Sequence, residues 1–230
     1  MPRSALITGG TGGLGSAVTH AFLDAGWRVV VPVYDQHEVK RLRPHERLVL
    51  EEADLFDAAS VAAVTALAAG DGGAPLGAVV NLVGGFAAGG RVHDTPVEDF
   101  ERQLRLNLRA TYLVCHAAIA HLIAAGGGAI VCVSSRAALR PFRGAAGYVV
   151  SKAALLSFVD VLAMEYRDDG IRANAILPSV IDTPGNRRSM PDADLERWVT
   201  PEQIAGVVRF LCEDGSGVVS GAHVPVYGRA

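Results

Sequence analysis

The chain has 230 residues, enough for one fairly large α/β domain. Half of its residues are hydrophobic and a fifth are charged, which favours a folded protein over a disordered one. The formal net charge of -3 and the lack of any run of Lys or Arg disfavour a nucleic-acid partner. No stretch of about eighteen uncharged apolar residues is apparent, so no membrane span is expected.

The cysteines and histidines bear on compartment and metal binding. Cys115, Cys132 and Cys212 are scattered and odd in number, which suits buried thiols in a reducing cytoplasm better than a disulfide framework. The seven histidines form no HExxH motif and no Cys/His cluster. The prediction is a cytoplasmic protein without a metal site.

Short apolar, β-branched runs alternate with longer helical patterns along the whole chain. Strands are expected at 5–7, 28–33, 48–50, 78–83, 129–133, 171–177 and 218–226. Helices are expected at 14–25, 58–69, 96–125, 148–166 and 201–212. Continuously apolar strands separated by helices indicate a parallel sheet with helices on both faces. The prediction is one α/β domain over 1–230, with a single doubly wound, Rossmann-type parallel sheet of about seven strands.

Two segments depart from this regular pattern. Pro32 lies inside the second strand although proline cannot donate to a ladder, so pairing is expected to be finishing there. Residues 184–199 hold two prolines and mixed charges, and are expected to form either a solvated loop or a substrate lid. Within them, Arg187 and Arg188 could bind an anionic substrate or could simply be solvated.

The first strand ends in a glycine-rich turn, Thr8-Gly9-Gly10-Thr11-Gly12-Gly13-Leu14-Gly15. Glycine is needed where a strand reverses sharply into a helix and where the backbone must approach a pyrophosphate closely. The helix that follows points unpaired N–H groups at such an anion. Because the turn lies between an apolar strand and an apolar-periodic helix, it predicts a nucleotide-binding site.

A second candidate group lies around the fifth strand and the helix after it. Tyr148 and Lys152 are four residues apart and therefore share one helix face. A phenol has a pKa of about 10, and a nearby ammonium would lower it towards the working range of a proton-transfer catalyst. Ser134 and Ser135 end the strand, at the edge of the sheet where ligands of parallel sheets bind.

The glycine turn resembles that of the short-chain dehydrogenase/reductase family, T-G-x-x-x-G-x-G, which Thr8, Gly9, Gly13 and Gly15 match position for position. The resemblance continues through further family positions to the C-terminal part: Asp54, Asn81, Gly84, Asn107, Pro178 and Thr183. The chain departs from the family in the N-N-A-G segment, which keeps only its first and last members. It departs again at Ser179, which replaces the glycine of P-G-x-x-x-T.

The resemblance implies an NAD(P)(H)-dependent oxidoreductase. Tyr148 would protonate the carbonyl oxygen as hydride arrives, and Ser135, selected over Ser134 by the family interval to the tyrosine, would hydrogen-bond that oxygen. Lys152 would lower the pKa of Tyr148 and bind the ribose hydroxyls. Asn107 would hold a water that relays protons to solvent.

The resemblance also implies a set of dinucleotide contacts. Asp54 would bind the adenine, and Pro178 and Thr183 would grip the nicotinamide carboxamide. The full set is Gly9, Gly13, Leu14, Gly15, Asp54, Asn81, Gly84, Tyr148, Lys152, Pro178, Ile181 and Thr183.

The end of the second strand bears on the choice of dinucleotide. An acidic residue there favours NAD and a basic one NADP, but family spacing leads to Val33, which is neither. Asp35 could reach the ribose if the strand is longer than expected, while Lys40, Arg41 and Arg43 lie further along. NAD and NADP both stay open, with a slight preference for NADP.

Residues 83–90 and 182–194 resemble the corresponding loops of dihydropteridine reductases, a branch of the same family that uses the Tyr/Lys pair without the serine. Because this chain has Ser135 and Asn107, a small-molecule ketone or alcohol is the preferred substrate, and a quinonoid pterin is the alternative. A dinucleotide sensor without catalysis is a third hypothesis. The resemblance also implies a homo-oligomer, a dimer or tetramer formed through the helices at 96–125 and 148–166.

Overall fold

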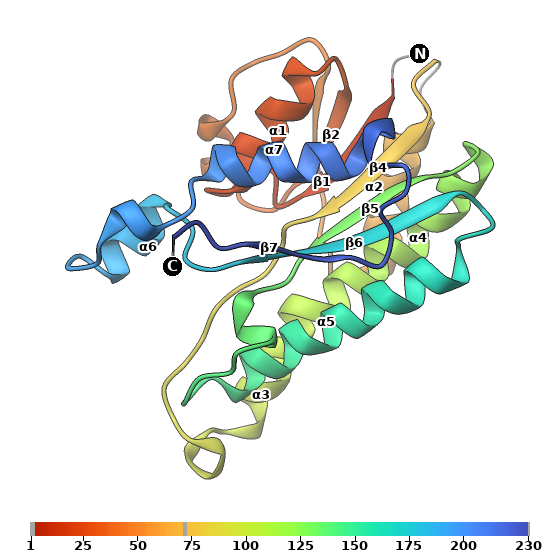
Figure 1. Ribbon diagram of the computed structural model, residues 1–230. Coiled ribbons are helices and arrows are strands. Elements are labelled where there is room, and N and C mark those ends of the chain that lie inside the picture. The colour runs from red at the N-terminus through yellow and green to blue at the C-terminus, as the bar shows by residue number, and fades with distance from the viewer. Residues whose placement is uncertain (1–2, 71–72, 230) are drawn as a thin grey trace.

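The structure, a computed structural model, describes residues 3–70 and 73–229. Its seven strands form one sheet in the order β3-β2-β1-β4-β5-β6-β7, and all neighbouring strands run parallel (Figure 1). The strands are β1 (Ser4–Thr8), β2 (Arg28–Val33), β3 (Leu48–Glu52), β4 (Leu76–Asn81), β5 (Gly128–Val133), β6 (Ile171–Pro178) and β7 (His223–Val226). The predicted doubly wound parallel sheet is confirmed.

Helices cover both faces of the sheet (Figure 1). One face carries α1 (Gly15–Asp24) and α7 (Pro201–Cys212), and the other carries α2 (Ala58–Ala69), α4 (Ala110–Ala124) and α5 (Ala146–Glu165). Ahead of α4, α3 (Val97–Leu104) is joined to it by one turn of π-helix, η3 (Arg105–Arg109). Shorter pieces are α6 (Pro184–Ser189) and the 3₁₀ turns η1 (Gln36–Arg41), η2 (Val92–Asp94), η4 (Arg136–Ala138), η5 (Leu195–Arg197) and η6 (Asp214–Ser216).

The core consists of two apolar layers, one on each side of the sheet. Alternation along β1 builds both, because Leu6 packs into the layer under α2, α4 and α5 while Ile7 packs into the layer under α1 and α7. Each side chain is fully buried, a change worth about 1.5–3 kcal/mol relative to exposure. Burial on both faces explains why the strands are continuously apolar.

The structure also refines the expected elements. Pro32 lies in β2, where it pairs with β3 at Glu51, whereas the register with β1 ends at Val30. Pairing with β1 has ended before the proline, as expected, whereas pairing with β3 continues through Val33. The last strand begins at His223 rather than at Val218, and the predicted single helix over 96–125 contains the π-turn η3. The segment 184–199 forms α6 and η5.

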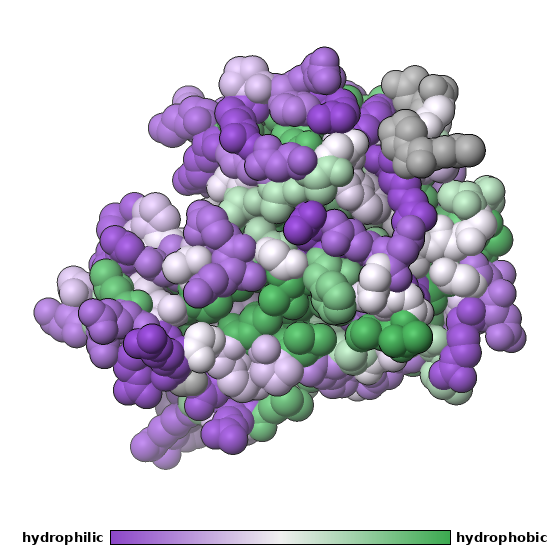
Figure 2. Space-filling view, turned by 45° about the horizontal axis from the view of Figure 1, so that its top comes forward, coloured by the Kyte–Doolittle hydropathy of each residue, from purple (hydrophilic) through white to green (hydrophobic). Residues whose placement is uncertain are grey.

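Two helical segments of the described chain are long and apolar enough to cross a membrane by length and composition, Val97–Ala124 and Ala146–Glu165. Length and composition alone do not test the expectation that the chain has no membrane span, because buried core helices meet the same criteria. α4 and α5 pack against the sheet. Figure 2 shows hydrophobic side chains gathered in the middle of one face of the molecule, with hydrophilic side chains around them.

Candidate active site

The glycine turn joins β1 to α1 and has no room for side chains. Gly9 has a φ of +67°, and a Cβ on Gly15 would lie 1.9 Å from the carbonyl oxygen of Gly9. A Cβ on Gly13 would lie 3.1 Å from Cγ2 of Thr183, so the loop after β6 lies directly against the turn. No side chain caps the start of α1, and its first turn holds no acid. The free N–H groups and the bare backbone fit a dinucleotide pyrophosphate.

Lys152 and Asn107 approach the backbone at Gly84, just after β4. A Cβ on Gly84 would lie 2.7 Å from Oδ1 of Asn107 and 3.0 Å from Nζ of Lys152. Glycine is therefore required for the two side chains to reach this point from α5 and η3. The carboxyl ends of β4 and β5 meet here, which is the ligand-binding edge of a parallel sheet.

Ser135 and Tyr148 face each other across the same edge. The Ser135 hydroxyl accepts a hydrogen bond from the backbone N–H of Ala137 (3.1 Å), which fixes it at the start of η4. The same hydroxyl lies beside the Tyr148 phenol. Burial raises the pKa of Tyr148 above its usual value because the phenolate loses solvation, and the nearby Ser135 hydroxyl offsets part of that rise.

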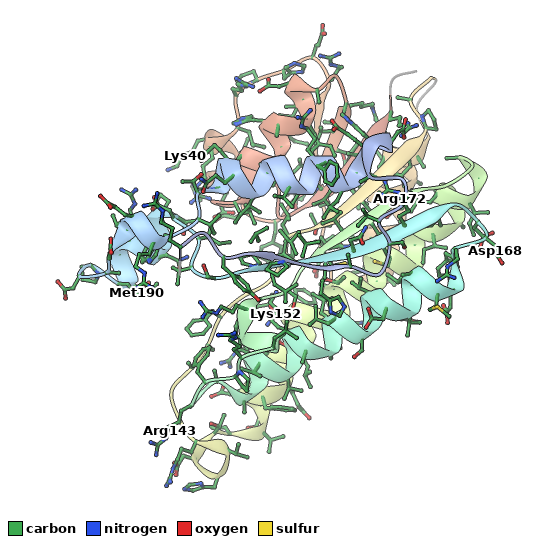
Figure 3. All side chains as sticks on the ribbon, in the orientation of Figure 1. Lys40, Arg143, Lys152, Asp168, Arg172 and Met190 are labelled. Atoms are coloured by element: carbon green, nitrogen blue, oxygen red, sulfur yellow. The ribbon has the colours of Figure 1, made fainter. Side chains whose placement is uncertain are left out.

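Lys152 lies buried at the base of the site (Figure 3). Its Nζ donates to the carbonyl oxygen of Val133 (2.8 Å), and burial lowers the pKa of Lys152 from 10.5 to about 8. Among the described residues no hydrogen bond joins Lys152 to Tyr148. Burial is the main influence on the pKa of Tyr148 in this structure, and the Lys152 ammonium is turned towards Val133. The effect of Lys152 on a phenolate at Tyr148 stays a prediction.

Asn107 lies in the π-turn η3 and is fully buried. Its Oδ1 accepts from the N–H of Gly85 (2.9 Å), and its Nδ2 donates to the carbonyl of Gly85 (3.1 Å). The same Nδ2 lies 3.3 Å from Oε1 of Gln103 and 3.1 Å from Oγ of Ser151. Protein groups thus occupy the side-chain amide, which holds the segment after β4 in place. π-turns are frequent at functional sites.

Two other predicted contact residues lie apart from this group. Asp54 is exposed, and its carboxylate accepts from the N–H of Phe56 (2.8 Å). Asn81 is buried with its Nδ2 towards the sulfurs of Cys115 (3.5 Å) and Cys132 (3.7 Å), and its Oδ1 has no hydrogen-bond partner. Neither lines the cavity described next.

A cavity of about 730 Å³ opens between these strand ends and the loops beyond them. Predicted residues lining it are Leu14, Gly84, Ser135, Tyr148, Lys152, Pro178 and Ile181. Phe86, Asn186 and Met190 also line it and lie in the two loops that resemble those of dihydropteridine reductases. Arg136, Arg140 and Phe142 line it as well, and the sequence did not single them out. The only sequence signal for Arg136 and Arg140 is that both follow Ser135 closely, by one and five residues.

A glycine turn that suits a pyrophosphate, and a phenol, a hydroxyl and an ammonium at the ends of neighbouring parallel strands, define an oxidoreductase of the Rossmann type. The family profile described as Enoyl-(Acyl carrier protein) reductase matches residues 9–228. The chain belongs to the short-chain dehydrogenase/reductase family and is an oxidoreductase enzyme of a family that binds NAD(P).

Relatives agree with this placement over nearly their whole length. The 2-(R)-hydroxypropyl-CoM dehydrogenase of Xanthobacter autotrophicus is 32% identical over 240 residues, which cover 96% of this chain and 96% of the relative. A short-chain type dehydrogenase/reductase from Mycobacterium ulcerans superposes with a TM-score of 0.91 at 25% identity, covering 99% and 89% of the two chains. ElxO with NADP bound superposes with a TM-score of 0.89 at 25% identity, covering 99% and 98%.

Proposed function

We propose that the protein catalyses NAD(P)(H)-dependent hydride transfer between the nicotinamide and a ketone or alcohol, with Tyr148 as proton donor and acceptor. The observation that carries the proposal is that Ser135, Tyr148 and Lys152 line one cavity, which begins at the glycine turn. The bound dinucleotide supplies the hydride. The chain's own residues supply the orientation and the proton.

The protonation states suit reduction near neutral pH. Because the pKa of Tyr148 lies above its usual value, the phenol keeps its proton until a substrate oxygen gains charge. Ser135 donates to that oxygen or to the phenolate that remains. Lys152, with a pKa of about 8, is positively charged at pH 7 and favours the phenolate left after the transfer.

The same proposal assigns the residues that hold the dinucleotide. The glycine turn would hold the pyrophosphate, and the cavity wall formed by Leu14, Gly84, Pro178 and Ile181 would hold the nicotinamide half. Thr183 lies against Gly13 but caps α6 through its hydroxyl. We propose that Asp54 contacts the adenine. Asn81 would instead serve the packing of the core, where its amide faces the Cys115 sulfur.

For the choice of dinucleotide we favour NADP(H). The Asp35 carboxylate, the acid nearest the end of β2, accepts from the N–H of His37 and starts η1. The Arg41 guanidinium donates to the carbonyl oxygen of Thr11 (3.2 Å), which puts a cation beside the turn where a 2′-phosphate would lie. Glu38 forms an ion pair with Arg41 (2.5 Å), and this pair would have to break before Arg41 could bind a 2′-phosphate. A lower KM for NADPH than for NADH would support this choice.

The remaining parts of the proposal are a cytoplasmic enzyme of one domain and a homo-oligomer, either a dimer or a tetramer. Three buried free thiols support the reducing compartment. An apolar groove of about 810 Å³ on the outer side of α3, α4 and α5 supports association, with Tyr112 half exposed and its ring tilted against that of Phe158. Sedimentation would give the number of subunits.

The experiment is a panel of ketones, alcohols and quinonoid dihydropterin assayed with NADPH and NADH. We expect turnover of at least one ketone, and Tyr148→Phe should lower kcat by about 10³-fold while leaving dinucleotide affinity unchanged. Reduction of the pterin alone would replace the ketone by the pterin alternative. Binding of the dinucleotide without turnover of any substrate would indicate a sensor.

A further inference from the structure

We propose that the substrate carries an anionic group, a carboxylate, sulfonate or phosphate, which Arg136 and Arg140 bind while its carbonyl lies at Ser135 and Tyr148. This inference rests on the proposed function and names the substrate class for the same site. It assigns Arg136 and Arg140 as specificity-determining residues.

The charges that line the cavity are of one sign. Its lining holds three cationic side chains, Arg136, Arg140 and Lys152, and no Asp or Glu. Within the described part of the chain, no ion pair is formed by Arg136 or Arg140, although nine other pairs are present. Cations that lack a carboxylate partner beside a catalytic group attract an anionic ligand and hold it by charge-assisted hydrogen bonds.

The two arginines are held on one side of the cavity. The backbone N–H of Arg140 donates to the carbonyl oxygen of Arg136 (2.9 Å), so the residues are one helical turn apart and their side chains leave the same side of that turn. The Arg136 guanidinium lies over the Tyr227 ring at 5.2 Å, and the residue is partly buried. This contact limits the conformations of Arg136 before a ligand arrives, which lowers the entropy cost of binding.

Other arginines near the site do not have these properties. Arg187 in α6 forms a bidentate pair with Asp182 (2.5 and 2.7 Å), which lowers the pKa of that carboxyl group and neutralises the guanidinium. Arg188 lies on the same helix and does not line the cavity. Arg143 lies at the far end of the loop after η4, away from Lys152 (Figure 3), and also does not line it. The anion site therefore differs from the one the sequence suggested.

The rest of the cavity constrains the body of the substrate. The Phe86 ring meets the Tyr148 ring edge to face at 5.0 Å, and Phe142 lies 6.2 Å from Phe86. Met190 lies opposite on the loop after α6 (Figure 3). These groups offer apolar surface beside the reacting centre. A short apolar chain or ring between the carbonyl and the anion would fit, which describes an oxo acid or its hydroxy acid.

The test uses matched pairs that differ only in charge. 4-Oxopentanoate and its methyl ester, and 4-oxopentanesulfonate as a second anion, are assayed with the dinucleotide-loaded wild type and with Arg136→Gln/Arg140→Gln. We expect kcat/KM to favour the acid by at least about 10-fold in the wild type. The double variant should lower kcat/KM for both anions by about 10- to 100-fold and for the ester by less than about 3-fold. Arg143→Gln, from the same loop, is the matched control and should change neither.

A binding measurement separates this inference from the proposed function. Tyr148→Phe loaded with NADP⁺ or NAD⁺ is titrated calorimetrically with the acid and with the ester, which requires no turnover. Tighter binding of the acid, lost when Arg136→Gln and Arg140→Gln are added, supports the anion site. Equal affinities, or a preference that survives both substitutions, would overturn it. Neutral ketones reduced as well as acids would overturn it while the proposed function stands. If the protein reduces no ketone, only the proposed function is contradicted. The titration then still shows whether the anion site exists.

Discussion

The two ends of the cavity are built in different ways. At the catalytic end, Ser135 follows β5, Lys152 projects from the middle of α5, and Asn107 fastens the segment after β4, so regular elements hold every group. At the substrate end, Phe86, Arg140 and Met190 lie on connecting segments, and these project beyond the strand ends (Figure 1). The comparison indicates that the rigid end sets the reaction and the loops set the substrate.

The largest effect is expected at the glycine turn, the most constrained part of the rigid end. In Gly15→Ala the new Cβ would lie 1.9 Å from the carbonyl oxygen of Gly9, so the turn must change shape. We expect dinucleotide Kd to rise by more than about 100-fold and the free energy of unfolding to fall by about 3 kcal/mol or more. Fluorescence titration with NADPH and urea unfolding would measure these effects.

Gly206→Ala is the matched control, because Gly206 is also helical and a Cβ added there would meet no atom within 4 Å. It should leave Kd unchanged and stabilise α7 by up to about 1 kcal/mol, the difference in helix propensity between Gly and Ala. Wild-type affinity in Gly15→Ala would mean that the pyrophosphate binds elsewhere.

The catalytic end of the cavity could be predicted from the sequence, whereas most of the substrate end could not. The turn, Ser135 and the Tyr148/Lys152 pair follow from local rules, because helical spacing sets which side chains share a face and strand ends of a parallel sheet converge. Those rules do not set the direction of a buried ammonium. The Lys152 side chain points towards Val133 because tertiary packing brings α5 beside the end of β5.

The substrate end needed the three-dimensional path of the loops. Arg187 and Arg140 look alike in sequence, but an acid five residues before Arg187 neutralises it, and Arg140 has no such partner among the described residues. The π-turn at Asn107 was also not predicted, because no residue type in the sequence marks a single i→i+5 turn within a long helix.

The next largest effect is expected where the rigid end holds the first loop. Asn107→Ala removes both bonds to Gly85 and leaves partly buried backbone groups unpaired. We expect the free energy of unfolding to fall by about 2–4 kcal/mol and kcat to fall by about 10- to 100-fold, since the wall beside Lys152 loses its support. Ser151→Ala removes only one partner of Asn107 and should cost less than half as much. Urea unfolding and initial rates would test both variants. An unchanged kcat in Asn107→Ala would show that the segment held by Asn107 does not affect the reaction.

A smaller effect with a pH signature is expected at Lys152. Its pKa is about 8 in the folded state and 10.5 unfolded, so below pH 8 both states are protonated and folding must bury the ammonium. That cost is at most about 3–4 kcal/mol, at about 1.4 kcal/mol per pKa unit. Lys152→Met should abolish most activity yet raise the free energy of unfolding by about 1–3 kcal/mol at pH 7.

The pH dependence provides the check on Lys152. Between pH 8 and 10.5 the folded wild type loses the proton first, so its stability rises and the advantage of Lys152→Met should shrink towards pH 10. Exposed Lys40→Met is the control and should show no such trend. A stabilisation by Lys152→Met that is constant from pH 7 to 10 would mean that the gain comes from packing and not from charge.

The smallest effect is expected at the loop end, where Phe142 is half exposed and its ring contacts only the Phe86 ring among the described aromatic residues. Phe142→Leu should raise KM by about 2- to 5-fold, leave kcat unchanged and alter the free energy of unfolding by less than about 0.5 kcal/mol, because it removes apolar contact that is uniform along the reaction. Leu139→Ala, exposed on the same loop but outside the cavity lining, should change neither constant. Steady-state kinetics on the preferred ketone would measure both variants. A fall in kcat for Phe142→Leu would show that Phe142, acting through Phe86, helps to orient Tyr148, and the loops would then share in the reaction itself.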